Sequence, residues 1–147
     1  MESPQNQIWG PNLWIILHSL AQKFGKTTKN LTEEKRLWTG LLSSLRWSLP
    51  CPHCKKHYSL YYIANPLSTD IRIWLHTLHN QINMRNGKQP VTIDQLEQYN
   101  VPFHFSYHYS FVYEQMILSL RIGWSSHNDI QRTIRFFNEM KCFYDLF

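Results

Sequence analysis

The chain has only three cysteines and five glycines among its 147 residues, and it has no long apolar run. Three cysteines are too few for the disulfide scaffold of a small secreted protein. No stretch reaches the roughly 18 uninterrupted apolar residues of a membrane span. The polar N-terminus also lacks the basic-then-apolar order of a signal peptide. These absences predict a cytoplasmic protein without a membrane span.

Other function classes are disfavoured because their signatures are missing. The net charge is +5, but the lysines and arginines form neither a dense basic stripe nor a recognised motif, so no nucleic-acid partner is expected. None of the glycines forms the G-x-G-x-x-G fingerprint of dinucleotide-binding folds. There is no internal repeat and no linker.

Aromatic residues are abundant at 15%, and hydrophobic residues as a whole make up 43% of the chain. A chain of this length and composition predicts one domain with a real core. Most of the rings are expected to fill that core. The alternative for some of them is a pocket that holds a planar cofactor, because flat rings stack on one another.

The apolar spacing is mostly helical. It predicts an all-α fold, with a four-helix bundle plus a short fifth helix in residues 1–100 and a mainly helical extension in residues 101–147. Residues 101–109 alternate aromatic and polar side chains and predict either a strand or an irregular connection. The helices are expected at about 11–24, 32–49, 52–65, 70–86, 92–99, 111–122 and 128–140.

The tetrapeptide Cys51-Pro52-His53-Cys54 is the most informative segment. The residue before a proline avoids the α region, which makes Cys51 a natural N-cap and Pro52 the first helical residue. A helix N-terminus favours a thiolate, and Lys55 and Lys56 are expected to lower the pKa of Cys54 further. The tetrapeptide therefore predicts a redox-active pair.

Other interpretations of this pair remain open at this point. A purely structural disulfide would close a very small loop and stabilise little. Zinc could be held by Cys51, His53, Cys54 and His57, although the only other cysteine is Cys142. A thiol–disulfide carrier without flavin is the third reading. A thioredoxin fold is disfavoured because the segment before Cys51 has helical rather than strand spacing.

Two further segments place polar side chains on otherwise apolar helices. Trp14 and His18 are four residues apart, and so are His79 and Asn83, so each pair shares a helix face. Any one of them alone is best explained as a satisfied core group. The whole set beside a C-x-x-C indicates a site.

These residues resemble the Erv/ALR family of FAD-linked sulfhydryl oxidases. The family pattern has a Trp-Gly-Pro-x-x-Trp-x-x-Leu-His opening, a C-x-x-C at a helix start, and a Trp-x-x-x-x-His-Asn-x-(Val/Ile)-Asn helix followed by Gly-Lys. All three parts occur here in order, over about residues 8–99. The short chain is most similar to members encoded by large DNA viruses, which would place it in the host cytoplasm or virion.

The resemblance implies a helical bundle that binds FAD non-covalently, with no metal. Cys51 would accept attack from the thiols of substrate proteins. Cys54 would pass electrons to FAD, and O₂ would reoxidise the flavin to give hydrogen peroxide. The FAD-binding residues that it implies are Gly10, Trp14, His18, Tyr58, His79, Asn80, Ile82, Asn83, Lys88 and Tyr99.

The chain also departs from the family pattern. The second, structural disulfide is absent, because His76 and Ile93 stand at the matching positions. A distal shuttle pair is absent as well, so substrates are expected to reach Cys51 directly. Cys142 is interpreted as a buried free thiol, with electron relay or a link between subunits as alternatives. The resemblance implies a homodimer, for which the apolar face of the first two helices could serve.

Overall fold

The computed structural model describes residues 2–27 and 29–147, and these residues form helices without any strand. The all-α prediction is confirmed. The elements are α1 (Asn6–Ala21), α2 (Leu31–Ser48), α3 (Pro52–Ala64), α4 (Ile71–Arg85), the 3₁₀ helix η1 (Asp94–Tyr99), α5 (Phe105–Arg121) and α6 (His127–Phe143).

The helices α3 and α4 begin and end within one residue of the bounds expected from the sequence. Cys51 is the N-cap of α3, and its Sγ accepts a hydrogen bond from the Cys54 backbone N–H at 3.2 Å. The carboxylate of Asp70 caps α4 in the same way. Gly87, with φ of +70°, follows α4 in the left-handed region that glycine tolerates without strain.

The first helix begins earlier than predicted. Pro11 lies inside α1 rather than in its first turn, and the N-cap is Gln5, whose side chain makes no capping bond. Instead, the backbone N–H of Gln5 donates to the side-chain oxygen of Gln115 on α5 at 2.6 Å. A tertiary contact therefore fixes the start of α1, which no local pattern could indicate.

Residues 101–104 form an irregular connection, as one of the two alternatives predicted, but residues 105–109 belong to a helix, so neither alternative holds there. His104 caps α5 by accepting a hydrogen bond from the Tyr107 backbone N–H at 3.3 Å. Phe105 and Tyr109, four residues apart, stack with their ring centroids 5.5 Å apart. These two rings contact each other at the i, i+4 spacing of a helix, and both pack on Phe137 of α6.

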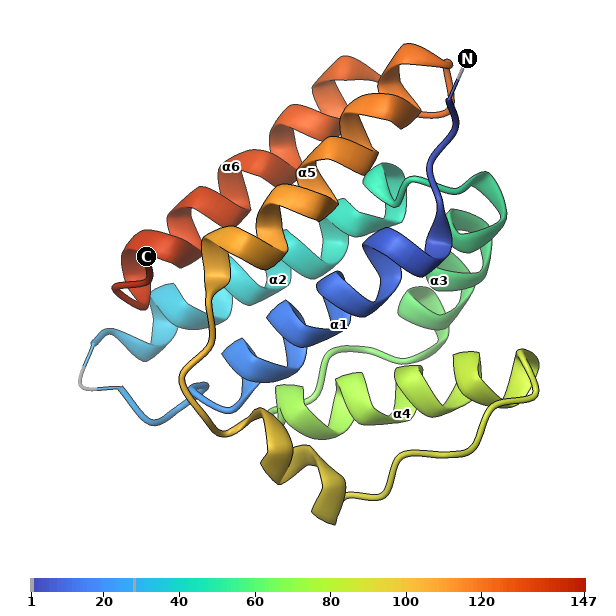
Figure 1. Ribbon diagram of the computed structural model, residues 1–147. Helices are drawn as coiled ribbons and strands as arrows, with labels where there is room; N and C mark the ends of the chain where they lie inside the picture. Colours follow the sequence, from blue (N-terminus) through green and yellow to red (C-terminus); the bar gives the residue numbers. More distant parts are fainter. Residues whose placement is uncertain (1, 28) are drawn as a thin grey trace.

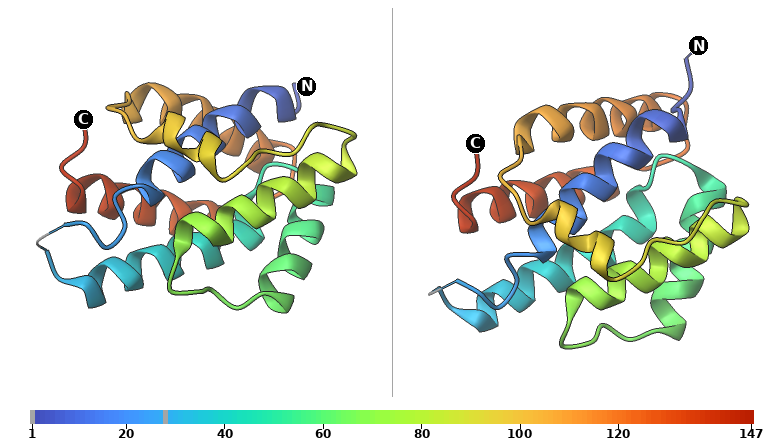
Figure 2. Two further views of the ribbon diagram at one scale, coloured as in Figure 1. Left: turned by 90° about the horizontal axis from the view of Figure 1, so that it is seen from below. Right: turned by 60° about the horizontal axis from the view of Figure 1, so that its bottom comes forward.

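The C-terminal helices cover the first two. Figure 1 shows α1, α2, α5 and α6 running side by side, with α3 and α4 on the other side of α1 and α2. Figure 2 shows the same arrangement from below, with η1 beside α4. α5 packs along α1, and α6 packs along α2. Residue 100, where the extension was expected to begin, lies in the connection between η1 and α5.

A buried polar network fixes the C-terminal end of this cover. The Trp38 indole N–H donates to the Tyr144 hydroxyl at 2.9 Å, and that hydroxyl donates to the Glu34 carboxylate. The other carboxylate oxygen of Glu34 accepts from the Gly25 backbone N–H at 3.1 Å. All of these side chains are buried, so each polar group has the partner that burial demands.

The contact between α2 and α6 depends on Gly40. A Cβ atom built there would lie 2.1 Å from the Phe136 ring, so that ring would have to move to admit any larger residue. Alanine normally stabilises a helix by up to about 1 kcal/mol over glycine, but overpacking costs about 1–3 kcal/mol. We expect Gly40→Ala to lower the free energy of unfolding in a urea titration.

Two variants check that prediction. Gly10→Ala, where a new Cβ would meet nothing within 4 Å, should stabilise the flavin-free protein. Adding Phe136→Ala should remove most of the Gly40→Ala penalty, because the clashing ring is gone. An unchanged penalty in the double variant would show that the ring is not its cause.

Candidate functional site

A cleft of about 840 Å³ lies among α1, α3, α4 and η1. Eight of the ten predicted cofactor residues line it, and so does Cys54. Its size falls within the range of pockets that bind small molecules and cofactors. The eight predicted residues are Gly10, Trp14, Tyr58, His79, Ile82, Asn83, Lys88 and Tyr99.

Flat rings form one wall of the cleft. Trp14 of α1 and His79 of α4 stack with centroids 4.0 Å apart and an interplanar angle of 3°. His18 stacks on Tyr99 at 4.7 Å and completes a continuous group of four rings. Tyr58 of α3 is held separately, because its hydroxyl donates to the Leu42 carbonyl. The wall therefore has the flat apolar surface that a planar ligand requires.

The two histidines of this group of rings, His79 in the wall and His18 behind it, share one hydrogen bond. His18 Nε2 and His79 Nδ1 are 2.9 Å apart, so one ring donates and the other accepts, and both are neutral. Burial, with repulsion from His79 and His76, lowers the pKa of His18 from 6.5 to about 3. Burial, with His76 and Lys88, lowers the pKa of His79 to about 4.

Acid should therefore destabilise the fold. Between pH 6.5 and about pH 4, the unfolded chain binds protons at His18 and His79 that the folded chain does not bind. Stability is full above pH 6.5 and falls as the pH decreases through this window. Because His79 is only partly buried, we discount for screening and expect a loss of roughly 1–2 kcal/mol per pH unit.

Urea unfolding between pH 7 and pH 5 measures this slope. His18→Gln should flatten it, because one of the two proton-linked groups is gone. His127→Gln, which changes an exposed histidine at the start of α6, is the matched control and should keep the slope of the parent protein. Equal slopes in all three proteins would contradict the assignment to the His18–His79 pair.

The lining of the cleft also includes polar and positively charged side chains. Arg85 and Lys88 line it together with His53 and His57, and only Lys88 was expected from the sequence. His57 lies three residues after Cys54, and Arg85 three after Ile82, so helical spacing from predicted residues could have identified both. Burial, with repulsion from Arg85, His53 and Lys56, lowers the pKa of His57.

The other two predicted contacts lie behind the wall of the cleft. His18 is buried and reaches the cleft only through His79 and Tyr99. Asn80 faces the segment after α4, where its side-chain amide accepts from the Val91 N–H at 2.7 Å and donates to the Val91 carbonyl at 2.9 Å. In this geometry both residues position residues of the wall.

The two sulfurs of the C-x-x-C have unequal surroundings. Cys54 lines the cleft, whereas Cys51 does not. Burial and the neighbouring Cys51 raise the pKa of Cys54 to about 12, against the lowering effects of the Asn6 side chain and the Cys54 backbone N–H. Both cysteines are free thiols. The expectation of a Cys54 thiolate is therefore wrong for this dithiol state.

The position of Lys55 helps to explain why the predicted Cys54 thiolate is not found. Its ammonium donates to the backbone carbonyl of Trp124 and, at 2.8 Å, to the hydroxyl of Ser125, both in the turn between α5 and α6. The charge is thus engaged by the C-terminal extension. No spacing within residues 1–100 could have indicated this partner.

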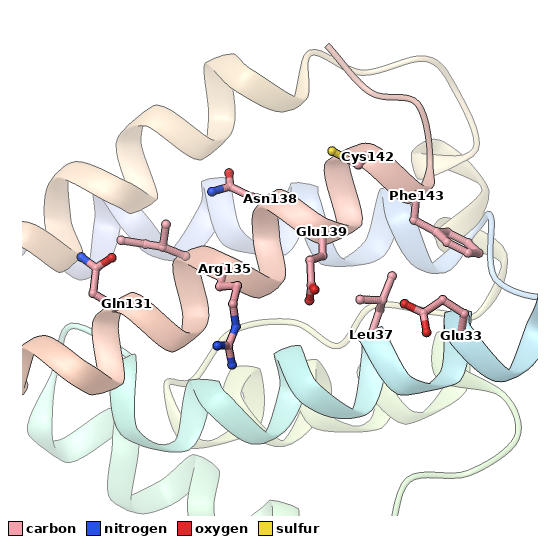
Figure 3. A pocket seen from close by; sticks show the side chains of 9 residues that line it. Glu33, Leu37, Gln131, Arg135, Asn138, Glu139, Cys142 and Phe143 are labelled. Carbon is pink, nitrogen blue, oxygen red and sulfur yellow. The ribbon is translucent and has the colours of Figure 1, made fainter.

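Cys142 is exposed, so its interpretation as a buried thiol is wrong. It lines an open groove of about 590 Å³ between α2 and α6. In Figure 3, Arg135 and Glu139 extend from α6 toward α2, which carries Leu37 and Glu33. Cys142 lies sixteen residues along α6 from its Ser126 cap, or about 24 Å, whereas Lys55 binds next to that cap.

The described part of the chain has neither a grouped metal site nor a helix suited to a membrane. Within residues 2–27 and 29–147, no three His, Cys, Asp or Glu side chains are grouped as a metal site. None of the helices in these ranges has the length and apolarity needed to cross a membrane.

The cleft fits FAD in its chemistry. Stacked rings suit the flat ring systems of the cofactor, and Arg85 and Lys88 suit its diphosphate. Side-chain amides, among them Gln81, Asn83 and Asn86, offer further donors and acceptors. A cysteine sulfur opens onto the same space.

A helical fold with a dithiol on the wall of such a cleft defines a class of redox proteins, and comparison with known proteins names the family. The model of the Erv1 / Alr family matches residues 11–101. The chain belongs to this family. The match covers the C-x-x-C and most of the cleft lining, whereas the lining residues before Pro11 and the helices α5 and α6 lie outside it.

Two curated relatives agree with this assignment. A protein of Frog virus 3 (isolate Goorha) named "Putative FAD-linked sulfhydryl oxidase 088R" is 31% identical over 93 residues, which cover 59% of this chain and 62% of the relative. "Sulfhydryl oxidase 1" of Oryza sativa subsp. japonica is 28% identical over 83 residues, 52% of this chain and 15% of the relative. The chain thus spans less than two thirds of either relative. No solved structure matches it significantly.

Proposed function

We propose that this protein is an FAD-dependent thiol oxidase that makes disulfide bonds in substrate proteins and reduces O₂ to hydrogen peroxide. The observation that carries the proposal is the position of Cys54 on the wall of a cofactor-sized cleft, with Cys51 outside it. Family membership and the names of both relatives support the same activity.

The two cysteines have different parts in the reaction. A substrate thiolate attacks Cys51 Sγ of the Cys51–Cys54 disulfide, and Cys54 leaves as a thiolate. A second substrate thiolate then attacks the substrate sulfur of the mixed disulfide and releases Cys51. The cysteine pair ends as a dithiol, and the substrate gains a disulfide.

The residues of the cleft would hold the cofactor. Trp14, His79 and Tyr99 would stack on its flat rings, and Arg85 and Lys88 would bind its diphosphate. When bound, FAD supplies a two-electron acceptor that O₂ can reoxidise. The pKa of about 12 keeps a proton on Cys54 in the dithiol, and this proton must leave before the sulfur can act as a nucleophile.

The visible spectrum of the purified protein tests this proposal most directly. We expect a yellow protein that absorbs near ~450 nm and consumes one O₂ for each disulfide formed in a dithiol substrate. A colourless protein with stoichiometric zinc would favour a zinc-binding interaction module instead. A colourless, metal-free protein that still exchanges disulfides would favour a flavin-free carrier.

A homodimer and a cytoplasmic or virion location remain proposals from the family resemblance. The apolar sides of α1 and α2, named above as the possible interface, are covered by α5 and α6 of the same chain. A dimer must therefore use another surface or displace these helices. Light scattering of the full chain and of a Cys142→Ser variant separates a disulfide-linked dimer from a non-covalent one.

A further inference from the structure

Asn6 lies at the first residue of α1, next to the inner sulfur. Its side-chain Nδ2 donates to Cys54 Sγ at 3.7 Å. Its Oδ1 accepts from the Trp9 indole N–H at 3.1 Å. An indole N–H can only donate, so this second bond fixes which end of the amide faces the sulfur.

The extension holds Asn6 in this place. α1 has no side-chain cap, and its N-cap residue is held instead by the bond from the Gln5 backbone N–H to the Gln115 side chain. Gln115 is buried on α5, so it is a fixed point rather than a mobile surface group. Figure 1 shows the start of α1 beside the C-terminal half of α5.

We propose that Asn6 is a further catalytic residue, whose amide N–H stabilises the Cys54 thiolate as it leaves, and that Gln115 is the positioning residue that holds it there. The inference deepens the proposed function and rests on it. When the substrate thiolate bonds to Cys51 Sγ, the Cys51–Cys54 bond breaks and its electron pair stays on Cys54. A hydrogen-bond donor to that sulfur lowers the pKa of the leaving group and speeds the exchange.

The other groups near Cys54 cannot easily replace this donor. The Lys55 ammonium is engaged by Trp124 and Ser125. The Cys54 backbone N–H already donates to Cys51 Sγ in the dithiol. His53 and His57 line the same cleft, but neither makes a hydrogen bond to the sulfur among the described residues. The Asn6 amide is therefore the side-chain donor to this sulfur in the structure.

The test measures Cys54 alone, in a Cys51→Ser background of the full chain. Asn6→Asp is nearly isosteric and can keep the bond from Trp9, but it replaces the donor with a negative charge. We expect iodoacetamide to alkylate Cys54 roughly tenfold more slowly at pH 8 in this variant, which corresponds to a rise of about one pH unit in its pKa. Asn138→Asp, an exposed change on α6 with the same charge, should leave the rate unchanged.

A second variant tests the anchor. Gln115→Met keeps the side-chain length but removes the acceptor for the Gln5 N–H, so alkylation of Cys54 should slow in the same direction. A change in folding alone would alter the denaturation midpoint without selectively slowing this thiol relative to Cys142, which serves as the internal reference. Equal Cys54 rates in the Asn6→Asp and Asn138→Asp proteins would overturn the proposal.

Alkylation requires neither flavin nor oxygen, so it separates the two proposals. A colourless protein with a slow Asn6→Asp thiol would overturn the oxidase but keep the Asn6–Cys54 interaction. A yellow, active protein with unchanged Asn6→Asp alkylation would do the reverse.

Discussion

Cys51→Ser should lose at least about a thousandfold in dithiol oxidation while it keeps bound FAD. Serine cannot form the disulfide that the substrate thiolate attacks, and Cys51 does not line the cleft, so the cofactor environment is left intact. Oxygen consumption with a small dithiol measures the loss, and the flavin spectrum measures retention.

Cys54→Ser should be equally inactive but should also shift the flavin spectrum, because its side chain opens onto the cleft. The contrast between the two variants is the sharpest check on their unequal parts. Cys142→Ser is the control, since this exposed thiol lies far along α6, and it should keep the activity on a small dithiol. Normal turnover in either C-x-x-C variant would refute the electron path.

His79→Ala should raise the dissociation constant for FAD by roughly a hundredfold or more. The change removes the ring that stacks on Trp14 at 4.0 Å and leaves the buried His18 without its hydrogen-bond partner. Loss of a ring that would stack on the cofactor, together with loss of the His18 bond that holds the wall ready for it, costs about 2–4 kcal/mol of binding free energy. Titration of flavin-free protein with FAD, followed by flavin fluorescence, gives the constant.

His79→Phe separates the two contributions. It keeps a flat ring against Trp14 but cannot bond His18, so its affinity should lie between those of the parent and the alanine variant. Helical circular dichroism of each variant confirms that the fold is retained. If His79→Ala bound FAD as tightly as the parent, the ring wall would not be the binding surface.

Local rules were sufficient to predict α3 and α4. The proline after Cys51, the carboxylate of Asp70 and the glycine after α4 act over three or four residues, and such effects are visible in a sequence. The cleft could be predicted in outline, because Trp14 shares a helix face with His18 and His79 shares one with Asn83. His57 and Arg85 were missed, although their helical spacing from Cys54 and Ile82 identifies them.

What the sequence could not indicate depends on contacts between distant residues. The early start of α1 rests on Gln115, more than a hundred residues away, and the Lys55 charge is engaged by the α5–α6 turn. The aromatic run at residues 105–109 has a period of two in polarity, yet its buried rings lie four apart. The segment is helical because a helix lets both Phe105 and Tyr109 pack on Phe137.

The cover that α5 and α6 form over α1 and α2 also bears on how this chain can be shortened. Removing residues 105–147 would leave the family-matched region intact in sequence, but it would expose apolar side chains on the sides of α1 and α2 that α5 and α6 now cover. Large exposed apolar patches promote association. A shortened chain would thus expose an apolar surface that favours association, and its solubility and subunit number would differ from those of the whole protein.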